Sequence, residues 1–309
     1  MTVSVCMSLY NGEQYIEQQL RSILKQTRQP DQVILCDDGS TDHTGEIVER
    51  FLAEHKLSGK WCYSRNEVNL GYPACFYHAM SLCSGDIVFL SDQDDIWKRQ
   101  KIEKMLAVFV MYPDAKVAAC KFGLIDSDGR LIHSVMTPVR SSETSAIRPV
   151  TPEAVFYKCE WPGMVMAYRR EWYQTWTQNS YGIPHDFLLC ARAAEENGFL
   201  QLDEILAWHR RHENNAGGEE HRITRLLNKE RKTKEIELYL KNLEQFETEH
   251  VLQTAQGKKA LETKINAMQG RYHALRSGKV GAVIQNAWRN RAETRLATFI
   301  CDVGITILG

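Results

Sequence analysis

The sequence predicts an α/β fold in which a mostly parallel central sheet is flanked by helices. In the first third of the chain, short apolar runs rich in β-branched residues alternate with segments whose apolar residues recur at helical spacing. Polar or acidic loops follow the first, second and fourth of these runs. The carboxyl ends of parallel strands meet at one edge of a sheet, where ligands bind in such folds. The sequence therefore predicts a ligand site at that edge.

Four strand and helix pairs are expected first. The strands are residues 2–9, 32–36, 61–64 and 86–90, and the helices cover 15–24, 47–52, 74–82 and the residues from about 98. The pattern then changes. We expect strands at 116–124, 164–168 and 200–208, a hairpin arm at 130–135, a loop over the site at 137–152, and helices from about 170 and up to 198.

Residues beyond 218 are rich in Lys, Glu, Gln and Leu and contain no proline. They predict a helical C-terminal subdomain, so the expected domains are residues 1–218 and 219–309. Near its end the chain carries basic residues with little opposing acid, followed by an apolar tail at 296–308. This arm has two interpretations, a peripheral contact with an anionic membrane or packing on the main domain or a partner subunit, which would make a homo-oligomer.

The bulk composition limits the partners and the compartment. The formal net charge of -1 gives no reason to expect nucleic acid as a partner. Nine cysteines form no CxxC pair, and the chain enters a strand without a secretory leader. No run reaches the about 18 to 20 apolar residues that span a bilayer. We therefore expect a cytoplasmic protein with free thiols, with any membrane contact peripheral on the inner face.

An acidic cluster follows the fourth predicted strand, in the sequence Ser91-Asp92-Gln93-Asp94-Asp95. Neighbouring carboxylates repel one another unless a cation lies close, and hard oxygen ligands suit Mg²⁺ or Mn²⁺. We expect one of these ions to hold a phosphate-bearing ligand here. The alternative is an acidic turn that caps the next helix.

A second acidic loop, residues 37–42, follows the second strand. Its carboxylates have the chemistry to accept hydrogen bonds from a nucleobase or a ribose, while amides at a helix N-terminus attract phosphate. The alternative is a turn in which Ser40 or Thr41 caps the following helix.

Several ordered motifs together resemble the family 2 glycosyltransferases with the GT-A fold, in particular the rhamnosyltransferase-like branch of bacterial surface-polysaccharide enzymes. These motifs are residues 5–11, 37–42, 69–71, 91–97, 184–187 and 209–215, so the resemblance covers roughly the first 215 residues. One departure is visible, because Cys75-Phe76 stands where similar sequences place Asn-Phe.

The resemblance implies a role for each matching residue. Those expected to bind the nucleotide sugar are Ser8, Tyr10, Asn11, Glu13, Asp37, Asp38, Asn69, Gly71, Asp92, Arg210 and Arg211. Asp92 and Asp94 would form the D-x-D motif, with Asp94 as the direct ligand of Mn²⁺ or Mg²⁺ and His212 on the metal or the diphosphate. Asp186 would be the catalytic base. The alternative is a purely structural role for Asp186 as the N-cap of a helix. The alternative for residues 209–213 is a solvated polar loop that binds no diphosphate.

The expected reaction is an inverting, metal-dependent transfer from a nucleotide sugar to a saccharide or lipid-linked acceptor in cell-surface polysaccharide synthesis. We expect the donor to be UDP- or dTDP-linked. Two alternatives remain open. A sugar-phosphate nucleotidyltransferase usually has a glycine- and arginine/lysine-rich loop after its first strand, which residues 10–14 lack. A non-catalytic nucleotide-sugar-binding protein would be expected to have lost the acids. Trp161 and Trp208 are expected either to stack on a sugar or to belong to the core.

Overall fold

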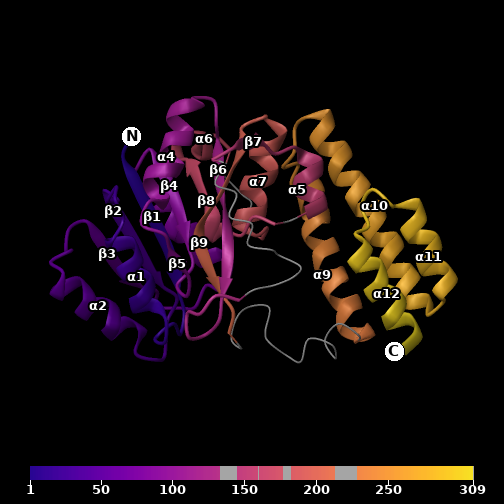
Figure 1. The fold of residues 1–309 in the computed structure, drawn as a ribbon, viewed down its shortest axis with the longest axis horizontal. Coiled ribbons are helices and arrows are strands. Elements are labelled where there is room, and N and C mark those ends of the chain that lie inside the picture. Colours follow the sequence, from indigo (N-terminus) through magenta and orange to yellow (C-terminus); the bar gives the residue numbers. More distant parts are fainter. Residues whose placement is uncertain (133–144, 159, 177–181, 213–227, 309) are drawn as a thin grey trace. The chain divides into compact units, whose positions relative to one another are not determined.

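The computed structural model describes residues 1–132, 145–158, 160–176, 182–212 and 228–308 (Figure 1). These residues form two compact units. Unit 1 comprises Met1–Thr151 and Glu160–Arg211, and unit 2 comprises Pro152–Cys159 and His212–Gly309.

A nine-stranded sheet forms the centre of unit 1 within the described residues. Its strands are β1 (Val3–Leu9), β2 (Gln32–Asp37), β3 (Trp61–Arg65), β4 (Ile87–Ser91), β5 (Ile96–Trp97), β6 (Val117–Ile125), β7 (Ile147–Pro149), β8 (Met166–Arg169) and β9 (Phe199–Arg210). Their order is β3-β2-β1-β4-β8-β6-β9-β5, with β7 paired to β9. The strands can be followed in Figure 1.

Half of this sheet is parallel and half is mixed. The pairs β3–β2, β2–β1 and β1–β4 are all parallel, as the first third of the sequence predicts. Beyond β4, β8 runs antiparallel to both β4 and β6, while β6 and β9 are parallel. Strands β5 and β7 both pair antiparallel with β9. The predicted α/β class with a flanked central sheet is confirmed, and its second half carries the antiparallel pairs.

Helices flank the sheet because one stripe of each is apolar. They are α1 (Ile16–Leu24), α2 (Thr44–Glu54), α3 (Ala74–Ser81), α4 (Lys101–Met111), α6 (Arg170–Gln174) and α7 (His185–Glu195), with a 3-10 turn at Gly163–Val165. In α1, Ile16, Leu20 and Ile23 recur at helical spacing and are fully buried. Burial of each such side chain contributes about 1.5 to 3 kcal/mol. Strand β4 is buried at every position, which rigidly supports the acidic loop after it.

Several predicted elements differ in detail. The helix expected from about Lys98 begins at Lys101, because Ile96 and Trp97 first pair with β9 as a short strand. The segment 137–152 was expected as a loop, but Ile147–Pro149 pairs with β9, so this prediction is wrong there; residues 137–144 lie outside the described residues. Of the expected hairpin arm at 130–135, Leu131 forms a single bridge with Ile125, and residues 133–135 are not described.

Unit 2 is helical, as its composition predicts. Its helices are α5 (Pro152–Lys158), α9 (Lys229–Thr248), α10 (Ala255–Ser277), α11 (Val280–Arg289) and α12 (Leu296–Leu308). Asn228 and Thr254 cap α9 and α10 with their side chains, and Gly278 ends α10 at a φ of 65°. The predicted boundary at residues 218 and 219 lies outside the described residues. No helix in the described part of the chain is long and apolar enough to cross a membrane.

The structure groups α5 with this helical unit, although it lies within the first 218 residues of the sequence. Phe156 of α5 packs edge-on against Phe246 of α9, with ring centroids 6.0 Å apart. Contacts of this kind between residues distant in sequence carry no local signal, which is why the sequence did not indicate them.

Candidate active site

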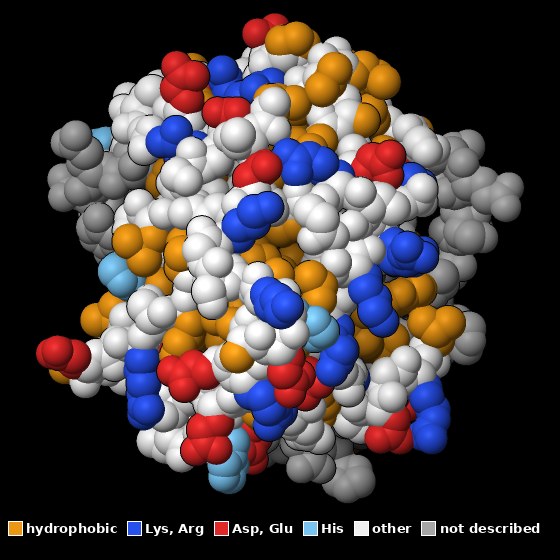
Figure 2. All heavy atoms as spheres, turned by 90° about the vertical axis from the view of Figure 1, so that its left-hand side faces the viewer, with side chains coloured by type: hydrophobic (Ala, Val, Ile, Leu, Met, Phe, Trp, Pro, Cys, Tyr) orange, Lys and Arg blue, Asp and Glu red, His pale blue; other side chains and the backbone are white. Residues whose placement is uncertain are grey.

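Three loops begin side by side at the carboxyl ends of β1, β2 and β4. In the sheet register, Leu9 of β1 lies opposite Asp37 of β2, and Met7 lies opposite Ser91 of β4. The loop after β1 thus faces both acidic loops, as the parallel arrangement predicts. On the face of unit 1 in Figure 2, acidic and basic side chains are interspersed.

Gln93 joins the first loop to the acidic cluster. Its Oε1 accepts a hydrogen bond from the Tyr10 amide at 2.9 Å, and its Nε2 donates to the Tyr10 carbonyl at 2.9 Å. This pair of bonds fixes the Tyr10 backbone and leaves the Tyr10 ring half exposed. The Tyr10 side chain is therefore accessible at the site, where the resemblance expects a nucleotide.

Asn11 and Glu13 join the first loop to the second. Asn11 has a φ of 47°, which Asn tolerates better than most residues, and its Oδ1 accepts from the Thr41 amide at 2.8 Å. The Glu13 carboxylate accepts from the His43 amide at 2.9 Å and lies 2.7 Å from His43 Nδ1. The hydrogen bond from the His43 amide lowers the pKa of Glu13, and the Glu13 carboxylate raises the pKa of His43.

Asp37 is fully buried and shapes its own loop. Its Oδ1 accepts from the Ser40 amide at 2.7 Å, and its Oδ2 accepts from the Tyr63 hydroxyl at 2.8 Å. Burial and this bond to Asp37 raise the pKa of Tyr63. The turn that the sequence offered as an alternative is thus present, and contact of Asp37 with a base or ribose remains a prediction.

Asp38 organises the loop that contains Asn69 and Gly71. Its two carboxylate oxygens accept from the amides of Leu70 and Gly71, each at 2.8 Å, while Asn69 Nδ2 donates to the Asp38 carbonyl at 2.8 Å. Gly71 has a φ of 73°, in the left-handed region that favours glycine. The structure therefore brings together the second and third predicted motifs through Asp38.

Ser8 and the substituted position Cys75 lie close together beneath these loops. Ser8 is half-buried on β1, and its hydroxyl lies close enough to the Cys75 thiol to lower the pKa of that thiol. Cys75 also accepts from Asn66 Nδ2 at 3.7 Å, and burial raises its pKa to about 11. A neutral thiol fills this position, where similar sequences place an amide.

The acidic cluster concentrates negative charge after β4. Asp92 and Asp94 are half-buried, and Asp95 is fully buried. Burial raises the pKa of Asp92 well above its usual range, and the charges of Asp95, Asp94 and Asp186 raise it further. The fold thus brings Asp186, which lies far along the chain, close enough for its charge to act on Asp92. Neighbouring carboxylates repel one another unless a cation lies close.

Lys101 of α4 supplies a buried positive charge behind the cluster. Its ammonium is fully buried, donates to the Met164 carbonyl and lies 3.6 Å from the centre of the Trp97 ring. Burial lowers the pKa of Lys101 to about 8, while the nearby charges of Asp95 and Asp92 oppose this shift. Sequence reasoning missed Lys101, because nothing in its spacing marks an inward-facing lysine.

Arg210 holds the acidic cluster from β9. Its guanidinium is fully buried, and its Nε donates to the Asp94 carbonyl at 2.8 Å. The same group donates to the carbonyls of Asp126 and Ser127 at 3.2 and 3.0 Å and to Gln18 Oε1 at 2.7 Å. Arg210 therefore supports the acidic cluster in this structure, and its predicted contact with a diphosphate remains a prediction.

Asp95 receives support from the same strand and from α1. Its Oδ1 accepts from the Arg210 amide at 3.0 Å and lies 3.2 Å from His209 Nδ1. The Gln19 side-chain amide is oriented so that both its nitrogen and its oxygen have partners. The nitrogen donates to the Asp95 carbonyl at 2.7 Å, and the oxygen accepts from the Ser91 hydroxyl at 2.7 Å. These contacts give Asp95 a structural role beside the D-x-D pair, and they place His209 at the site instead of in a solvated loop.

Asp186 lies in the first turn of α7. The N-cap of α7 is Pro184, so the interpretation of Asp186 as the N-cap is wrong. Its Oδ1 accepts from the Phe187 amide at 2.8 Å, and the carboxylate is half-buried. The Phe187 amide therefore fixes the Asp186 side chain at a half-buried position.

The segment before Asp186 is anchored on α3. The Tyr77 hydroxyl donates to the Ile183 carbonyl at 2.8 Å, and the buried His185 ring stacks on Phe76 with centroids 4.2 Å apart. Burial lowers the pKa of His185, which favours the neutral ring. These contacts set the direction in which α7 begins and hence the position of Asp186.

The remaining predicted residues are placed as follows. Arg211 is exposed, and its amide donates to the Ile125 carbonyl at 2.8 Å. His212 opens unit 2, and residues 213–227 after it are not described. Trp161 is buried and donates to Gln201 Oε1 at 2.9 Å, as a core tryptophan would, while Trp208 lies against Gly123.

The donor set suits a hard divalent cation that is shared with a substrate. Within the described residues, no three His, Cys, Asp or Glu side chains form a ready-made metal cage. Mg²⁺ usually takes one or two carboxylates and completes its shell with waters and substrate phosphates. Asp92 and Asp94 supply that small number of oxygen ligands, so the residues present fit the group.

Comparisons with known proteins agree with this geometry. The family model described as glycosyl transferase family 2 matches residues 4–177. The dTDP-rhamnosyl transferase RfbG of Shigella flexneri is 36% identical over 107 residues, which cover 34% of this chain and 37% of RfbG. The chain spans about half the length of the first curated relatives it matches.

Two solved structures share the fold. S. aureus TarS 1-349, in complex with UDP-GlcNAc, superposes with a TM-score of 0.62 at 18% identity over 99% of this chain and 90% of that one. The mannosyltransferase PcManGT of Pyrobaculum calidifontis, in complex with GDP-Man and Mn²⁺, gives 0.56 at 17% identity over 99% and 86%. The family model spans more than half of the chain, and this protein therefore belongs to glycosyl transferase family 2.

Proposed function

We propose that this protein is an inverting, metal-dependent glycosyltransferase that moves a sugar from a nucleoside diphosphate to a saccharide or lipid-linked acceptor in cell-surface polysaccharide synthesis. The observation that carries the proposal is the juxtaposition of Asp186 with Asp92. One carboxylate follows a sheet strand and the other begins a helix, and their charges interact. Because the two acids lie on separate elements, Asp92 can help to hold the metal at the leaving diphosphate while Asp186 takes the proton of the acceptor hydroxyl.

The proposed mechanism assigns the leaving group to the acidic cluster. Asp94, with Asp92 beside it, would hold Mn²⁺ or Mg²⁺, and the bound cation would supply positive charge to the departing diphosphate. Gln93 and Arg210 hold the backbone on either side of these ligands. His212 and Arg211 are proposed to reach the same diphosphate.

Asp186 is proposed as the general base. An acceptor hydroxyl is a poor nucleophile until a carboxylate takes its proton, and one displacement with one base inverts the anomeric carbon. Asp186 lies in the first turn of α7, and the Phe187 amide donates to its Oδ1, which fixes the side chain where the other oxygen can accept that proton. Its half-buried position leaves room for an acceptor to approach.

The nucleotide is proposed to bind over the loops that Asp38 and Asn11 connect. The donor is proposed to be UDP- or dTDP-linked. The name of RfbG as a dTDP-rhamnosyl transferase and the UDP-GlcNAc complex of TarS support these two bases, while the Mn²⁺ complex of PcManGT supports a divalent metal. These similarities do not extend to the acceptor.

The test is release of nucleoside diphosphate from a panel of nucleotide sugars with Mn²⁺ or Mg²⁺ and a mixture of saccharide and lipid-linked acceptors. The wild type is compared with Asp94→Ala, Asp186→Asn and a matched surface variant, Asp114→Asn. We expect metal-dependent turnover that falls by at least about 100-fold in Asp186→Asn, because a general base contributes about 100- to 10,000-fold. Turnover should also fall in Asp94→Ala, because the metal that serves the leaving diphosphate loses a ligand.

Nucleotide binding, measured by calorimetry, separates the two roles. Asp186→Asn should bind the nucleoside diphosphate as the wild type does, whereas Asp94→Ala should lose the metal-dependent part of that affinity. Pyrophosphate release from a nucleoside triphosphate and a sugar phosphate would favour the nucleotidyltransferase instead. Nucleotide-sugar binding without turnover on any acceptor would favour a non-catalytic binding protein.

A further inference from the structure

Large apolar side chains are exposed on α11 and α12 of unit 2. Trp288 is 71% exposed and Leu296 is 73% exposed, at the corner where α11 leads into α12. We define the C-terminal face as five of the exposed large apolar residues of these two helices. Its members are Ile284, Trp288, Leu296, Ile300 and Ile307.

The C-terminal face follows helical periodicity and lies opposite the packed side of α12. Leu296, Ile300 and Ile307 recur at i, i+4 and i+11, which places them on one stripe of the helix. The buried residues Asp302 and Ile305 fall on the other side, where α12 packs within unit 2. The exposed side chains Leu296, Ile300 and Ile307 therefore do not contribute to the core of unit 2.

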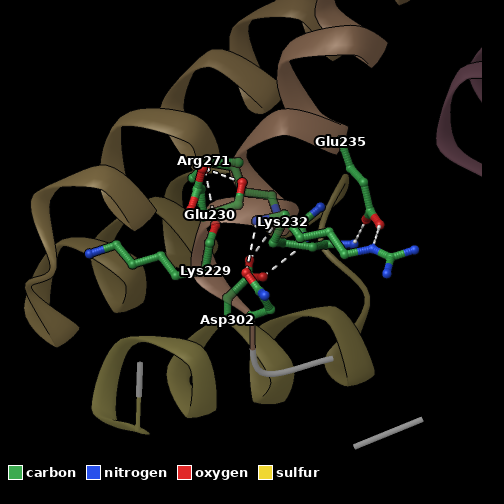
Figure 3. Close-up of polar contacts among 9 residues, drawn as sticks. Lys229, Glu230, Lys232, Glu235, Arg271 and Asp302 are labelled. Carbon is green, nitrogen blue, oxygen red and sulfur yellow. Dashed lines mark hydrogen bonds and ion pairs between the residues drawn. The ribbon is translucent and has the colours of Figure 1, made fainter. Parts of the chain in front are cut away.

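The acids of this segment are turned away from solvent. Residues 280–308 contain two acidic residues, Glu293 and Asp302. The Asp302 carboxylate accepts from Arg271 Nε at 2.7 Å and Nη2 at 2.8 Å, a two-point ion pair that Figure 3 shows between α12 and α10. Glu293 lies 3.6 Å from Lys264 Nζ, and both side chains are largely buried. Cations of α10 thus neutralise both acids inside the unit.

The basic residues of the same segment are exposed. They are Arg289, Arg291 and Arg295, which flank Trp288 and Leu296 along the chain. The Arg291 guanidinium lies 5.8 Å from the centre of the Trp288 ring. The sequence alone counts two acids against three arginines here, but the structure leaves the arginines at the surface and the acids inside.

We propose that the C-terminal face binds an anionic lipid surface. Exposed aliphatic side chains would enter the boundary between headgroups and acyl chains, Trp288 would lie at the headgroup level, and the arginines would meet lipid phosphates. Charge complementarity favours this occupant over a second copy of the chain, whose matching face would present the same arginines. The inference does not depend on sugar transfer.

The experiment is cosedimentation of the full chain with vesicles of phosphatidylcholine, alone or mixed with phosphatidylglycerol. We expect binding to the anionic vesicles and little to the neutral ones, with affinity falling as salt increases. The triple variant Arg289→Glu/Arg291→Glu/Arg295→Glu should bind at least about 100-fold more weakly, because each basic residue near an anionic surface contributes about 1 kcal/mol. Trp288→Ser should also weaken binding. Leu238→Ser, at an exposed apolar residue of α9, should bind as the wild type does.

Circular dichroism and urea denaturation confirm that each variant is folded. Equal binding to both vesicle types, or anionic binding that the triple variant retains, would overturn the proposal. Failure to bind either vesicle would do the same. Light scattering after gel filtration measures whether the protein is a monomer or a dimer. If the wild type is a dimer and Trp288→Ser is a monomer, the C-terminal face binds a second copy of the chain and not a lipid surface.

Discussion

The role of Arg210 offers the sharpest test of how the acidic cluster is held. In Arg210→Met, four hydrogen bonds disappear, and the carbonyl oxygens of the half-buried Asp94 and Asp126 lose a donor. An unsatisfied buried acceptor costs about 1 to 3 kcal/mol, so two half-buried carbonyls that lose their donor cost about 2 to 6 kcal/mol together. We expect the free energy of unfolding to fall by about 2 to 6 kcal/mol.

Urea denaturation at constant pH measures this loss, and calorimetric titration with nucleoside diphosphate and Mn²⁺ measures the consequence for the site. We expect weaker metal-dependent nucleotide binding in Arg210→Met, because the Asp94 backbone is no longer fixed. Arg210→Lys retains the charge without the planar fork of donors, so it should recover only part of the stability. A stability loss below about 1 kcal/mol combined with abolished nucleotide binding would refute the reasoning, because it would place the guanidinium on the diphosphate.

Three further predictions concern other parts of the site. Gln93→Ala should lower stability by about 1 to 2 kcal/mol in urea denaturation, since both backbone groups of Tyr10 lose a partner; an unchanged midpoint would contradict this. The pKa of Lys101 is lowered from 10.5 to about 8 in the folded protein. Between pH 8 and pH 10.5, Lys101 is therefore protonated in the unfolded chain and neutral in the folded one. Wild-type stability should therefore rise relative to Lys101→Met by about 3 kcal/mol from pH 8 to pH 10.5, and parallel pH curves would argue against the assignment. The pKa of His43 should fall in Glu13→Gln when followed by nuclear magnetic resonance. The stability that this pair contributes is present below the ordinary histidine pKa and disappears as pH rises through the raised one, so an unmoved His43 pKa would show that the contact is absent in solution.

Local patterns in the sequence were enough to predict the parallel half of the sheet. Apolar runs such as 86–90 and amphipathic helices such as 15–24 report burial directly through their periodicity. The order of polar loops after β1, β2 and β4 then predicted which edge carries the site. The register of Leu9 with Asp37 and of Met7 with Ser91 confirms that these loops begin side by side at that edge.

The antiparallel half of the sheet was less predictable. Strand β5 has two residues and β7 has three, and both exist because they pair with β9. A segment of two or three residues is too short to show the alternation of apolar and polar residues that marks a strand. Both segments are strands because they hydrogen-bond to β9. The same limit explains why the loop prediction failed at Ile147–Pro149.

What the sequence by itself determined is the fold class and the family, because motif and periodicity are properties of neighbouring positions; the residues that it assigns to the chemistry stay a prediction. Only the tertiary structure decided that Asp186 acts on Asp92, that Lys101 and Arg210 lie buried around the acidic cluster, and that Asp302 faces Arg271 instead of solvent. These relations join residues far apart in the chain. Their energies come from burial and from distance in space, which no local pattern records.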